Sequence, residues 1–163
     1  MAGREMSAPA AYRAPHRSRR DDVDDLAAAD RAVRLGLVGV GGRLSAVPTD
    51  PSEAVHRTDR EHDERMARRL ERFIAVPDGS FAWTRVGEQH HLGRIDGPWR
   101  YDDSAEAVEL DLVNVRPCAW VPVPIKQVPA DVLATFGRGG RNFQRIHSTA
   151  AERASAGLWS DLV

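Results

Sequence analysis

The sequence predicts an α+β domain in which short antiparallel strands are flanked by helices. From Phe81 to Trp120, apolar and polar residues alternate in short segments separated by Gly, Pro and Asp, which is typical of strands joined by tight turns. On either side of this stretch, apolar residues recur at helical spacing. Three of the four tryptophans lie within the stretch, so its rings form a core, a binding pocket or both.

Length and charge indicate one domain. Any basic surface on it must be confined to a small region. The 163 residues are 29% charged, but the formal net charge is only -1, so bulk charge gives no general attraction for nucleic acid. The single cysteine, Cys118, excludes an internal disulfide and a cysteine-based zinc site. No apolar run approaches the ~20 residues of a membrane helix, and no signal-peptide core follows Met1. We therefore expect a cytoplasmic protein without a membrane partner.

Composition divides the chain into a tail, a domain and a second tail. Residues 1–20 are rich in Ala, Pro, Ser and Arg and cannot bury enough apolar surface to order themselves, which predicts a disordered basic tail. Residues 21–150 hold the periodic segments and form the predicted domain. Residues 151–163 are predicted as a C-terminal tail, in which Trp159 is either docked or free.

A helix and a strand are expected first. Residues 21–35 begin with paired aspartates, which suit a helix N-terminus, and they end before Gly36, which suits a helix stop. The apolar run at 37–42 predicts a strand that enters a glycine turn. Its glycines either let a ligand approach the backbone closely or simply let the strand leave the core. Leu44 stands where a dinucleotide-binding fingerprint needs a glycine, so that function is excluded.

A loop and a second helix should follow. Two prolines predict a loop over 43–55. Thr58 and Glu61 fit a capping box, with Thr58 as the N-cap. Apolar side chains then recur at helical spacing as far as Ile74, and the opposite face is charged, as solvated helix faces are. Pro-Asp-Gly at 77–79 ends this helix.

The remaining elements are predicted from the alternation of apolar and polar residues and from the Gly, Pro and Asp residues that interrupt it. Strands are expected at 81–85, 90–95, 99–101, 110–115 and 119–123. Gly93 indicates a bulge or a close approach to the backbone. The acidic run at 102–109 predicts a loop. A helix is expected at 129–136, a glycine-rich break at 137–142 and a further short helix at 143–147.

The sequence contains no convincing catalytic or metal-binding constellation. His90 and His91 are neighbours on a strand, so their side chains point to opposite faces and cannot share a metal ion. Cys118 is expected as a small buried hydrophobe, and no Gly-x-Ser-x-Gly nucleophile motif occurs. We therefore expect a protein that is not an enzyme, with no catalytic residue, no metal and no cofactor.

The glycine-rich run at 137–141 has two interpretations. Consecutive glycines can turn backbone N–H groups toward an anion, and Arg138 and Arg141 would then grip a phosphate. The same run also suits a plain turn between helices with solvated arginines. Both interpretations stay open at the level of sequence.

Rings on neighbouring strands carry the main functional hypothesis. The candidate base-binding residues are Trp83, Trp99, Tyr101 and Trp120. Such rings can wall a slot in which a planar base stacks, which is worth roughly 1–3 kcal/mol per base. Proteins that inspect one base take it out of the duplex into a snug pocket. The competing interpretation is that large rings on sheet faces are core, with Trp83 and Trp120 inside and only Trp99 and Tyr101 at a slot.

Four segments occur in an order that resembles a known family. A glycine-bearing strand at 37–42 precedes Phe-Ala-Trp-Thr-Arg at 81–85, Leu-Gly-Arg-Ile-x-Gly-Pro-Trp-Arg-Tyr at 92–101 and Val-x-Val-Arg-Pro-x-x-Trp at 113–120. This order is similar to the PUA-like superfamily, especially the EVE-like domains found with modification-dependent restriction systems. The resemblance covers about residues 35–146.

The resemblance implies a small, strongly bent, antiparallel or mixed β-barrel with flanking helices. It also implies a non-enzymatic module that binds nucleic acid, DNA in preference to RNA, and holds a modified or flipped base in an aromatic cage. Candidate contacts to the nucleic-acid backbone are Arg43, Arg94, Arg100, Arg138 and Arg141. The loop that would shape the pocket mouth contains Gly39, Gly41 and Gly42. A role in restriction or defence would need an effector protein on a separate chain.

Two other functions stay open. The balanced charge and the charged helix also suit a structural or protein-interaction module that binds no nucleic acid. An enzyme acting on a small molecule in the same barrel is the third candidate. It would require a pocket that contains a perturbed His91 or an aspartate.

Overall fold

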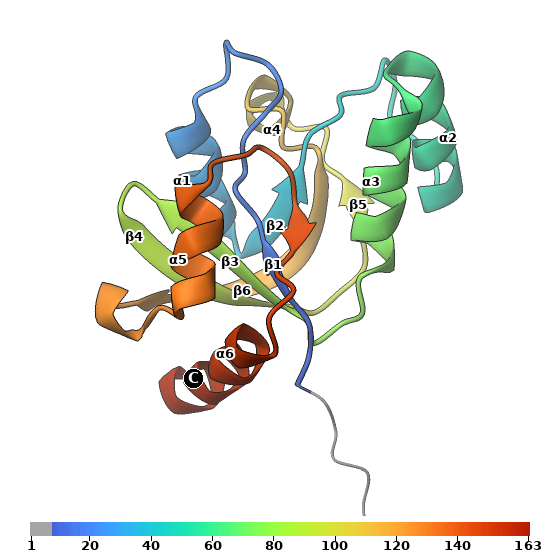
Figure 1. Cartoon of the computed structure of the whole chain (residues 1–163). Helices are drawn as coiled ribbons and strands as arrows, with labels where there is room; N and C mark the ends of the chain where they lie inside the picture. The colour runs from blue at the N-terminus through green and yellow to red at the C-terminus, as the bar shows by residue number, and fades with distance from the viewer. Residues whose placement is uncertain (1–7) are drawn as a thin grey trace, which may run out of the picture.

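The structure is a computed structural model that describes residues 8–163. It has an α+β fold in which a curled mixed sheet forms a half-barrel with helices packed around it (Figure 1). The strands are β1 (Ala11–Arg13), β2 (Leu37–Val40), β3 (Phe81–Val86), β4 (Gln89–Ile95), β5 (Arg100–Tyr101), β6 (Asn114–Val123) and β7 (Gln144–Arg145). The helices are α1 (Asp25–Leu35), α2 (Pro51–Glu61), α3 (Glu64–Ala75), α4 (Ala105–Glu109), α5 (Ala130–Gly137) and α6 (Thr149–Leu162), with a 3-10 turn η1 (Ile125–Gln127).

Strand β6 curls the sheet because its two halves have different partners. The strand order is β2-β6-β4-β3-β1-β7, with β5 also paired to β6. The half before Cys118 pairs with β2 and β5, and the half from Cys118 onward pairs with β4. Two strands separated by Pro117 were expected, but β6 is continuous. Pro117 lies where the partner changes, and its carbonyl oxygen still accepts from Asp96 N at 3.0 Å.

The N-terminal segment belongs to the sheet, which corrects the expected disordered tail at 1–20. Strand β1 pairs in parallel with β3 and antiparallel with β7, and Figure 1 shows it in the middle of the molecule. The polar side chains that predicted disorder are in part buried, among them Arg13, His16 and Ser18. Each has hydrogen-bond partners, which offset much of the cost of its burial, although Nε of Arg13 has none among residues 8–163. Residues 1–7 of the expected tail lie outside the described residues.

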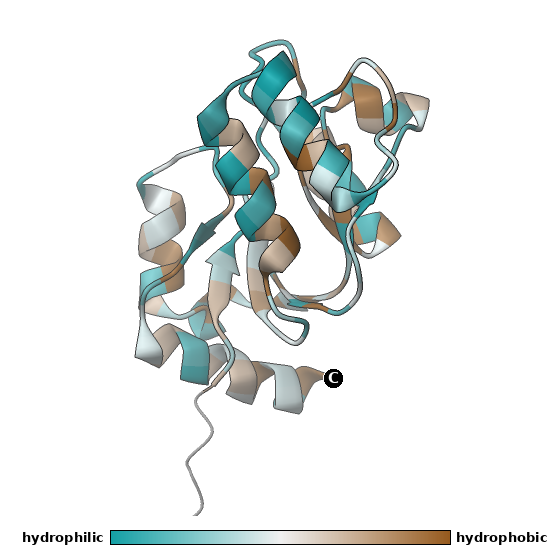
Figure 2. Ribbon diagram, turned by 90° about the vertical axis from the view of Figure 1, so that its right-hand side faces the viewer, coloured by the Kyte–Doolittle hydropathy of each residue, from teal (hydrophilic) through white to brown (hydrophobic). Residues whose placement is uncertain are grey.

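Helices α2 and α3 form a pair where the sequence predicted a loop and one helix. The Asp50 side chain accepts from Glu53 N at 2.8 Å and starts α2, and Pro51 takes the first helical position, which tolerates proline. Thr58, expected as an N-cap, is instead buried within α2 and donates to Ala54 O at 2.7 Å. Asp63 starts α3. Figure 2, in which this pair faces the viewer, shows that its outer surface is largely hydrophilic.

Three further segments differ from their predictions. The acidic run at 102–109 contains the short helix α4, which the Ser104 side chain caps. Residues 143–147 contain β7 in place of a helix, because this segment pairs with β1. The expected tail at 151–163 lies mostly in α6, which packs on the sheet through Trp159 against Phe81, with ring centroids 6.2 Å apart.

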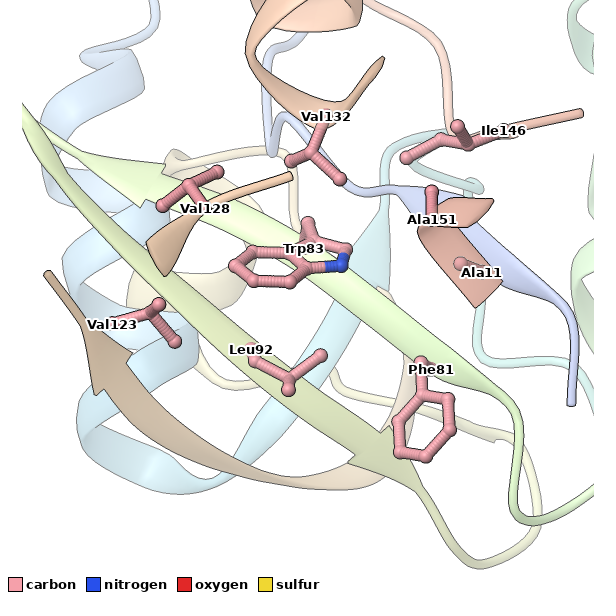
Figure 3. Packing of buried hydrophobic residues seen from close by; sticks show 9 residues of the cluster. All are labelled: Ala11, Phe81, Trp83, Leu92, Val123, Val128, Val132, Ile146 and Ala151. Carbon is pink, nitrogen blue, oxygen red and sulfur yellow. The ribbon is translucent and has the colours of Figure 1, made fainter. Parts of the chain in front are cut away.

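Two buried clusters fill the structure on the two sides of the curled sheet. The first surrounds Trp83, whose ring lies between the sheet and helices α5 and α6 (Figure 3). Its indole nitrogen donates to Ser155 Oγ at 2.9 Å. The second cluster includes Leu70 and Phe73 of α3, and they pack over Ile95. Helix α3 therefore lies over the concave side of β4 and β6, next to the site described below.

The buried guanidinium of Arg116 fixes the end of α3 to β6. Its Nη1 donates to Phe73 O at 3.1 Å and to Val76 O at 2.6 Å, which satisfies carbonyls at the helix C-terminus. Its Nε donates to Gly97 O at 3.0 Å, and Nη2 pairs with Asp78 Oδ1 at 2.7 Å. Because one side chain binds all four groups, α3 and the bend before β5 are held together.

Gly93→Ala should destabilise the protein, because the indole of Trp120 lies directly on this part of β4. A Cβ at Gly93 would lie 2.5 Å from Cys118 Sγ and 2.5 Å from a Trp120 ring carbon. We expect a loss of about 1–3 kcal/mol in the free energy of unfolding, measured by urea denaturation. Gly157→Ala on α6, where a Cβ meets nothing within 4 Å, is the control and should stabilise by roughly 0.5–1 kcal/mol. Equal urea midpoints for Gly93→Ala and the wild type would contradict this packing.

Candidate functional site

One cavity collects residues from five separate segments on the concave side of the half-barrel. It is lined by residues from 15–19, 39–42, 66–70, 111–112 and 141–143, and its volume is about 80 Å³. By the measure in which one water needs ~10–15 Å³, this space holds several waters or a small planar ring. Two of these segments, 39–42 and 141–143, include glycines or an arginine predicted from the sequence, and the other three were not predicted to form a site.

The apolar wall of the cavity contains one aromatic ring, that of Phe143. This ring stacks on Tyr12 with centroids 4.9 Å apart and an interplanar angle of 11°. It also makes a T-shaped contact with Phe73, with ring centroids 5.1 Å apart. Met66 and Leu70 of α3 complete this side. The ring is therefore held by two others, and a ligand that enters the cavity meets a rigid aromatic group.

A buried carboxylate, that of Asp111, closes the polar side. Its Oδ1 accepts from Gly42 N at 3.0 Å and its Oδ2 accepts from Ser18 Oγ at 2.7 Å. Asp111 itself has a left-handed backbone with φ of 50°. A Cβ on Gly41 would lie 2.6 Å from Oδ2, so the loop after β2 needs glycine to pass the carboxylate. The carboxylate thus joins this loop to the N-terminal segment.

His16 is a neutral ring within the cavity lining. Gly39 N donates to its Nε2 at 3.3 Å, so Nδ1 carries the proton and donates to Thr84 Oγ1 at 2.9 Å. Burial lowers the pKa of His16 to about 3. The ring edge also meets the indole of Trp120, with centroids 6.0 Å apart. His16 therefore positions β2 against β3 and supplies no charge to a ligand at neutral pH.

Arg13 organises the glycine-rich loop that leads to Phe143. Its buried guanidinium donates to Thr135 O at 3.1 Å, Gly139 O at 3.0 Å and Asn142 O at 3.4 Å. Burial, and secondarily the charge of Arg138, lowers the pKa of Arg13 from its ordinary value. Carbonyl oxygens of the glycine-rich run thus face a cation of the protein itself. This geometry favours the interpretation of the run as a structural turn.

Four arginines line the cavity, at positions 17, 19, 69 and 141. Three of them pair with exposed carboxylates, at N–O distances of 3.2 Å for Arg17–Asp25, 3.4 Å for Arg19–Asp63 and 3.0 Å for Arg141–Asp21. Exposed pairs of this kind contribute only about 0–1 kcal/mol. A phosphate can therefore replace the carboxylates at little cost, and the mouth of the cavity can bind an anion.

The sequence-predicted rings do not converge on this cavity. Trp83 has no exposed surface and lies in the core. Trp120 is half-buried and donates from Nε1 to Leu37 O at 2.8 Å. Trp99 donates to Asn114 Oδ1 at 3.0 Å, and the hydroxyl of Tyr101 accepts from Leu44 N at 3.0 Å. All four rings support the sheet or its loops, and none of them lines the cavity.

The predicted pocket-mouth glycines do line the cavity, whereas most predicted arginines lie elsewhere. Gly39, Gly41, Gly42 and Arg141 are in the lining. Arg43 is half-buried and donates to Val108 O at 3.1 Å. The side chains at positions 94, 100 and 138 are exposed and outside the lining.

Sequence reasoning missed several cavity residues, including Ser18, Arg69, Asp111 and Phe143. Asp111 could have been noticed as a charged residue between two leucines in an apolar run, which is a pattern of burial. Phe143 follows directly on the glycine-rich run, where an isolated ring is unusual. The N-terminal residues gave no usable signal, since their composition is that of a disordered tail.

Comparison with protein-family models and with curated proteins gives no match to this chain. Within residues 8–163 there is also no group of three or more His, Cys, Asp or Glu side chains that could hold a metal ion. No helix in the same range is long and apolar enough to cross a membrane. We therefore infer function from the cavity and its rim.

The buried His16 should make stability depend on pH. The folded protein keeps this ring neutral down to a pKa of about 3, whereas in the unfolded chain it titrates near 6.5. Its contribution is therefore fully present above about pH 6.5 and is lost as the pH falls toward 3, by about 1.4 kcal/mol per pH unit. Burial lowers the pKa of His90 and His91 too, so their effects have the same sign.

The measurement is the free energy of unfolding in urea from pH 7 to pH 4 for the wild type and for His16→Gln. The variant should be less stable at pH 7 and should show a shallower decrease toward pH 4. His56→Gln, which removes an exposed ring on α2, controls for the loss of a histidine. A slope in His16→Gln as steep as that of the wild type would show that His16 is not buried neutral.

Proposed function

We propose that this chain is a PUA/EVE-like module that binds nucleic acid without catalysis and receives a single modified or flipped base in the cavity beside Phe143. The observation that carries the proposal is the convergence of one rigid ring and four arginines on one cavity of about 80 Å³. Ligand sites are mostly apolar with a few placed polar groups, and this cavity has that character. The ring would stack on the base and the arginines would hold the phosphates.

The polar side of the cavity suits recognition of a base edge. Asn142 lines the space, and its amide can both donate and accept. Ser18 lines it too, but its hydroxyl already donates to Asp111 and accepts from Arg20 N. The backbone at Gly41 and Gly42 lies close to the same space, since these residues carry no side chain. A base taken out of its stack would thus meet hydrogen-bonding groups on one side and Phe143 on the other.

The resemblance in motif order supports the same proposal and favours DNA as the nucleic acid. The half-barrel with packed helices agrees with the small bent barrel that this resemblance implies. In this proposal Trp99 keeps a role, although it does not touch the base. It donates to Asn114, whose Nδ2 donates to Gly41 O at 3.0 Å, so it positions the loop at the cavity.

A small-molecule enzyme in the same barrel has less support. For such an enzyme, the pocket was expected to contain His91 with a shifted pKa, or an aspartate. His91 lies outside the cavity lining, and both carboxylate oxygens of Asp111 accept hydrogen bonds from the protein. His16 is neutral and both its nitrogens are engaged. An aspartate therefore does line the cavity, but hydrogen bonds hold both Asp111 and His16 to the protein, which favours binding over catalysis.

Phe143→Ala should weaken binding of an oligonucleotide that carries the recognised base. The expected loss is about 5- to 150-fold, since stacking on one ring contributes roughly 1–3 kcal/mol. Fluorescence anisotropy at low salt, with unmodified and base-modified DNA and RNA strands and duplexes, measures it. Phe136→Ala is the matched control, because Phe136 lies on α5 near His90 and away from the cavity.

Thermal unfolding of both variants separates lost binding from lost folding. Absence of binding by the wild type to every oligonucleotide in low salt would contradict the proposal. Equal weakening by Phe143→Ala and Phe136→Ala would place the binding site elsewhere.

A further inference from the structure

Helix α3 carries a row of arginines that the protein itself does not neutralise. Arg65, Arg69 and Arg72 are spaced four and three residues apart, which places them along one face of the helix. Within residues 8–163 none of the three forms an ion pair, whereas Arg68 on the same helix pairs with Glu64. Three like charges on one face repel one another, so this face favours an anion.

Arg69 is the one arginine of these three with a buried guanidinium nitrogen that has no partner among the described residues. Its Nη1 is buried and has no hydrogen-bond partner among residues 8–163. Burial lowers the pKa of Arg69, the charges of Arg19, Arg65 and Arg72 lower it further, and only Asp63 opposes them. A guanidinium N–H that is buried without an acceptor is costly, and a phosphate oxygen is the acceptor that its fork fits best.

Arg69 also lies at the junction of two hollows. It lines the cavity described above, and it lines a wider groove of about 590 Å³ between α3 and β7. Asn142 and Phe143 are shared by both hollows as well. Arg72 and Arg145 also line this groove. A chain molecule with one group in the cavity can therefore continue directly into the groove.

We propose that the groove between α3 and β7 binds the sugar-phosphate strand next to the inserted base, with Arg69 on the phosphate at the junction and Arg72 and Arg145 on the strand beyond it. This inference rests on the proposed function, since it takes the occupant of the groove to be the same strand. Arg145 pairs with Glu152 at 3.2 Å and would exchange this partner for a phosphate. The site assigned here differs from the backbone contacts expected at positions 43, 94, 100 and 138.

An oligonucleotide with a single abasic site tests the groove apart from the cavity, because it has strand but no base to insert. We expect Arg69→Gln combined with Arg72→Gln to weaken binding of the abasic and the intact strand by a similar factor, about 10- to 100-fold at low salt. The dependence of log K on log salt should become shallower by about 0.7 for each phosphate of a single strand that the protein no longer neutralises. Phe143→Ala should weaken the intact strand more than the abasic strand, because Phe143 lines the groove as well as the cavity but stacks only on an inserted base.

Two further variants control for the loss of charge and for the shape of the guanidinium group. Arg68→Gln removes the same charge from the same helix but lies outside both hollows, and it should bind both strands as the wild type does. Arg69→Lys keeps the charge without the fork and should lie between the wild type and Arg69→Gln. Unchanged thermal unfolding would show that the variants fold.

Each outcome decides something different. If the double variant binds both strands with wild-type affinity and salt dependence while Phe143→Ala still weakens the intact strand, the groove is not the strand site and the proposed function stands. If the wild type binds neither strand, both proposals are wrong. Weakened abasic binding in the double variant and not in Arg68→Gln supports the groove.

Discussion

The cavity depends on one requirement, that the polar side chains buried with the N-terminal segment find partners. Arg13, His16 and Ser18 are all buried, and each would destabilise the fold if its donors or acceptors were left unpaired. Their partners lie on four different parts of the chain. Arg13 binds the loop before β7, His16 binds β2 and β3, and Ser18 binds Asp111. Three of these parts, all but β3, contribute residues to the cavity lining, so the bonds that hold the N-terminal segment in place also shape the site.

Two of the buried guanidiniums, those of Arg13 and Arg116, hold the surroundings of the cavity by the same chemistry. Arg13 and Arg116 both donate mainly to backbone carbonyl oxygens, and for Arg116 these include the carbonyls at the end of α3, where a helix favours positive charge. Carbonyls satisfy most of the N–H groups, and the carboxylate of Asp78 balances the charge of Arg116. Arg116 thereby fixes α3, and Arg13 fixes the loop that carries Phe143. The ring and the arginine row of α3 are held at a set separation by groups that no ligand has to touch.

The sequence predicted those parts of the fold that local pattern determines. The hairpin of β3 and β4 follows from alternation and a turn, and the end of α1 follows from Gly36, although α1 begins at Asp25 after the cap Asp24 and not at the paired aspartates 21–22. Strand β1 could not be found, because it pairs in parallel with a strand about seventy residues away and its residues look disordered by composition. Proline at position 51 was taken as a breaker although the first helical position accepts it.

The same limit applies to the candidate site. Alternation places Trp83 on a sheet face, but it does not say whether that face meets helices or a cavity. The helices that cover Trp83 are α5 and α6, and the second of these was expected to be a tail. The cavity is built from five segments that long-range pairing brings together. Most of its polar side chains are bound by partners far away in the sequence, and no local motif indicates those contacts. The glycines at 39, 41 and 42 were found because tight backbone passage requires glycine itself.

The charge distribution suggests how such a site would gain selectivity. Three of the four arginines that line the cavity, Arg17, Arg19 and Arg141, pair with exposed aspartates, and the formal net charge of the chain is -1. Long-range attraction to a polyanion is then weak, and a phosphate gains only by replacing a carboxylate at short range. Arg69 is different, because it has no internal partner to lose and its buried Nη1 reaches an acceptor only when a ligand supplies one. If the proposed function holds, binding energy would be concentrated where strand and base meet, and a strand whose base cannot enter beside Phe143 would be held less tightly.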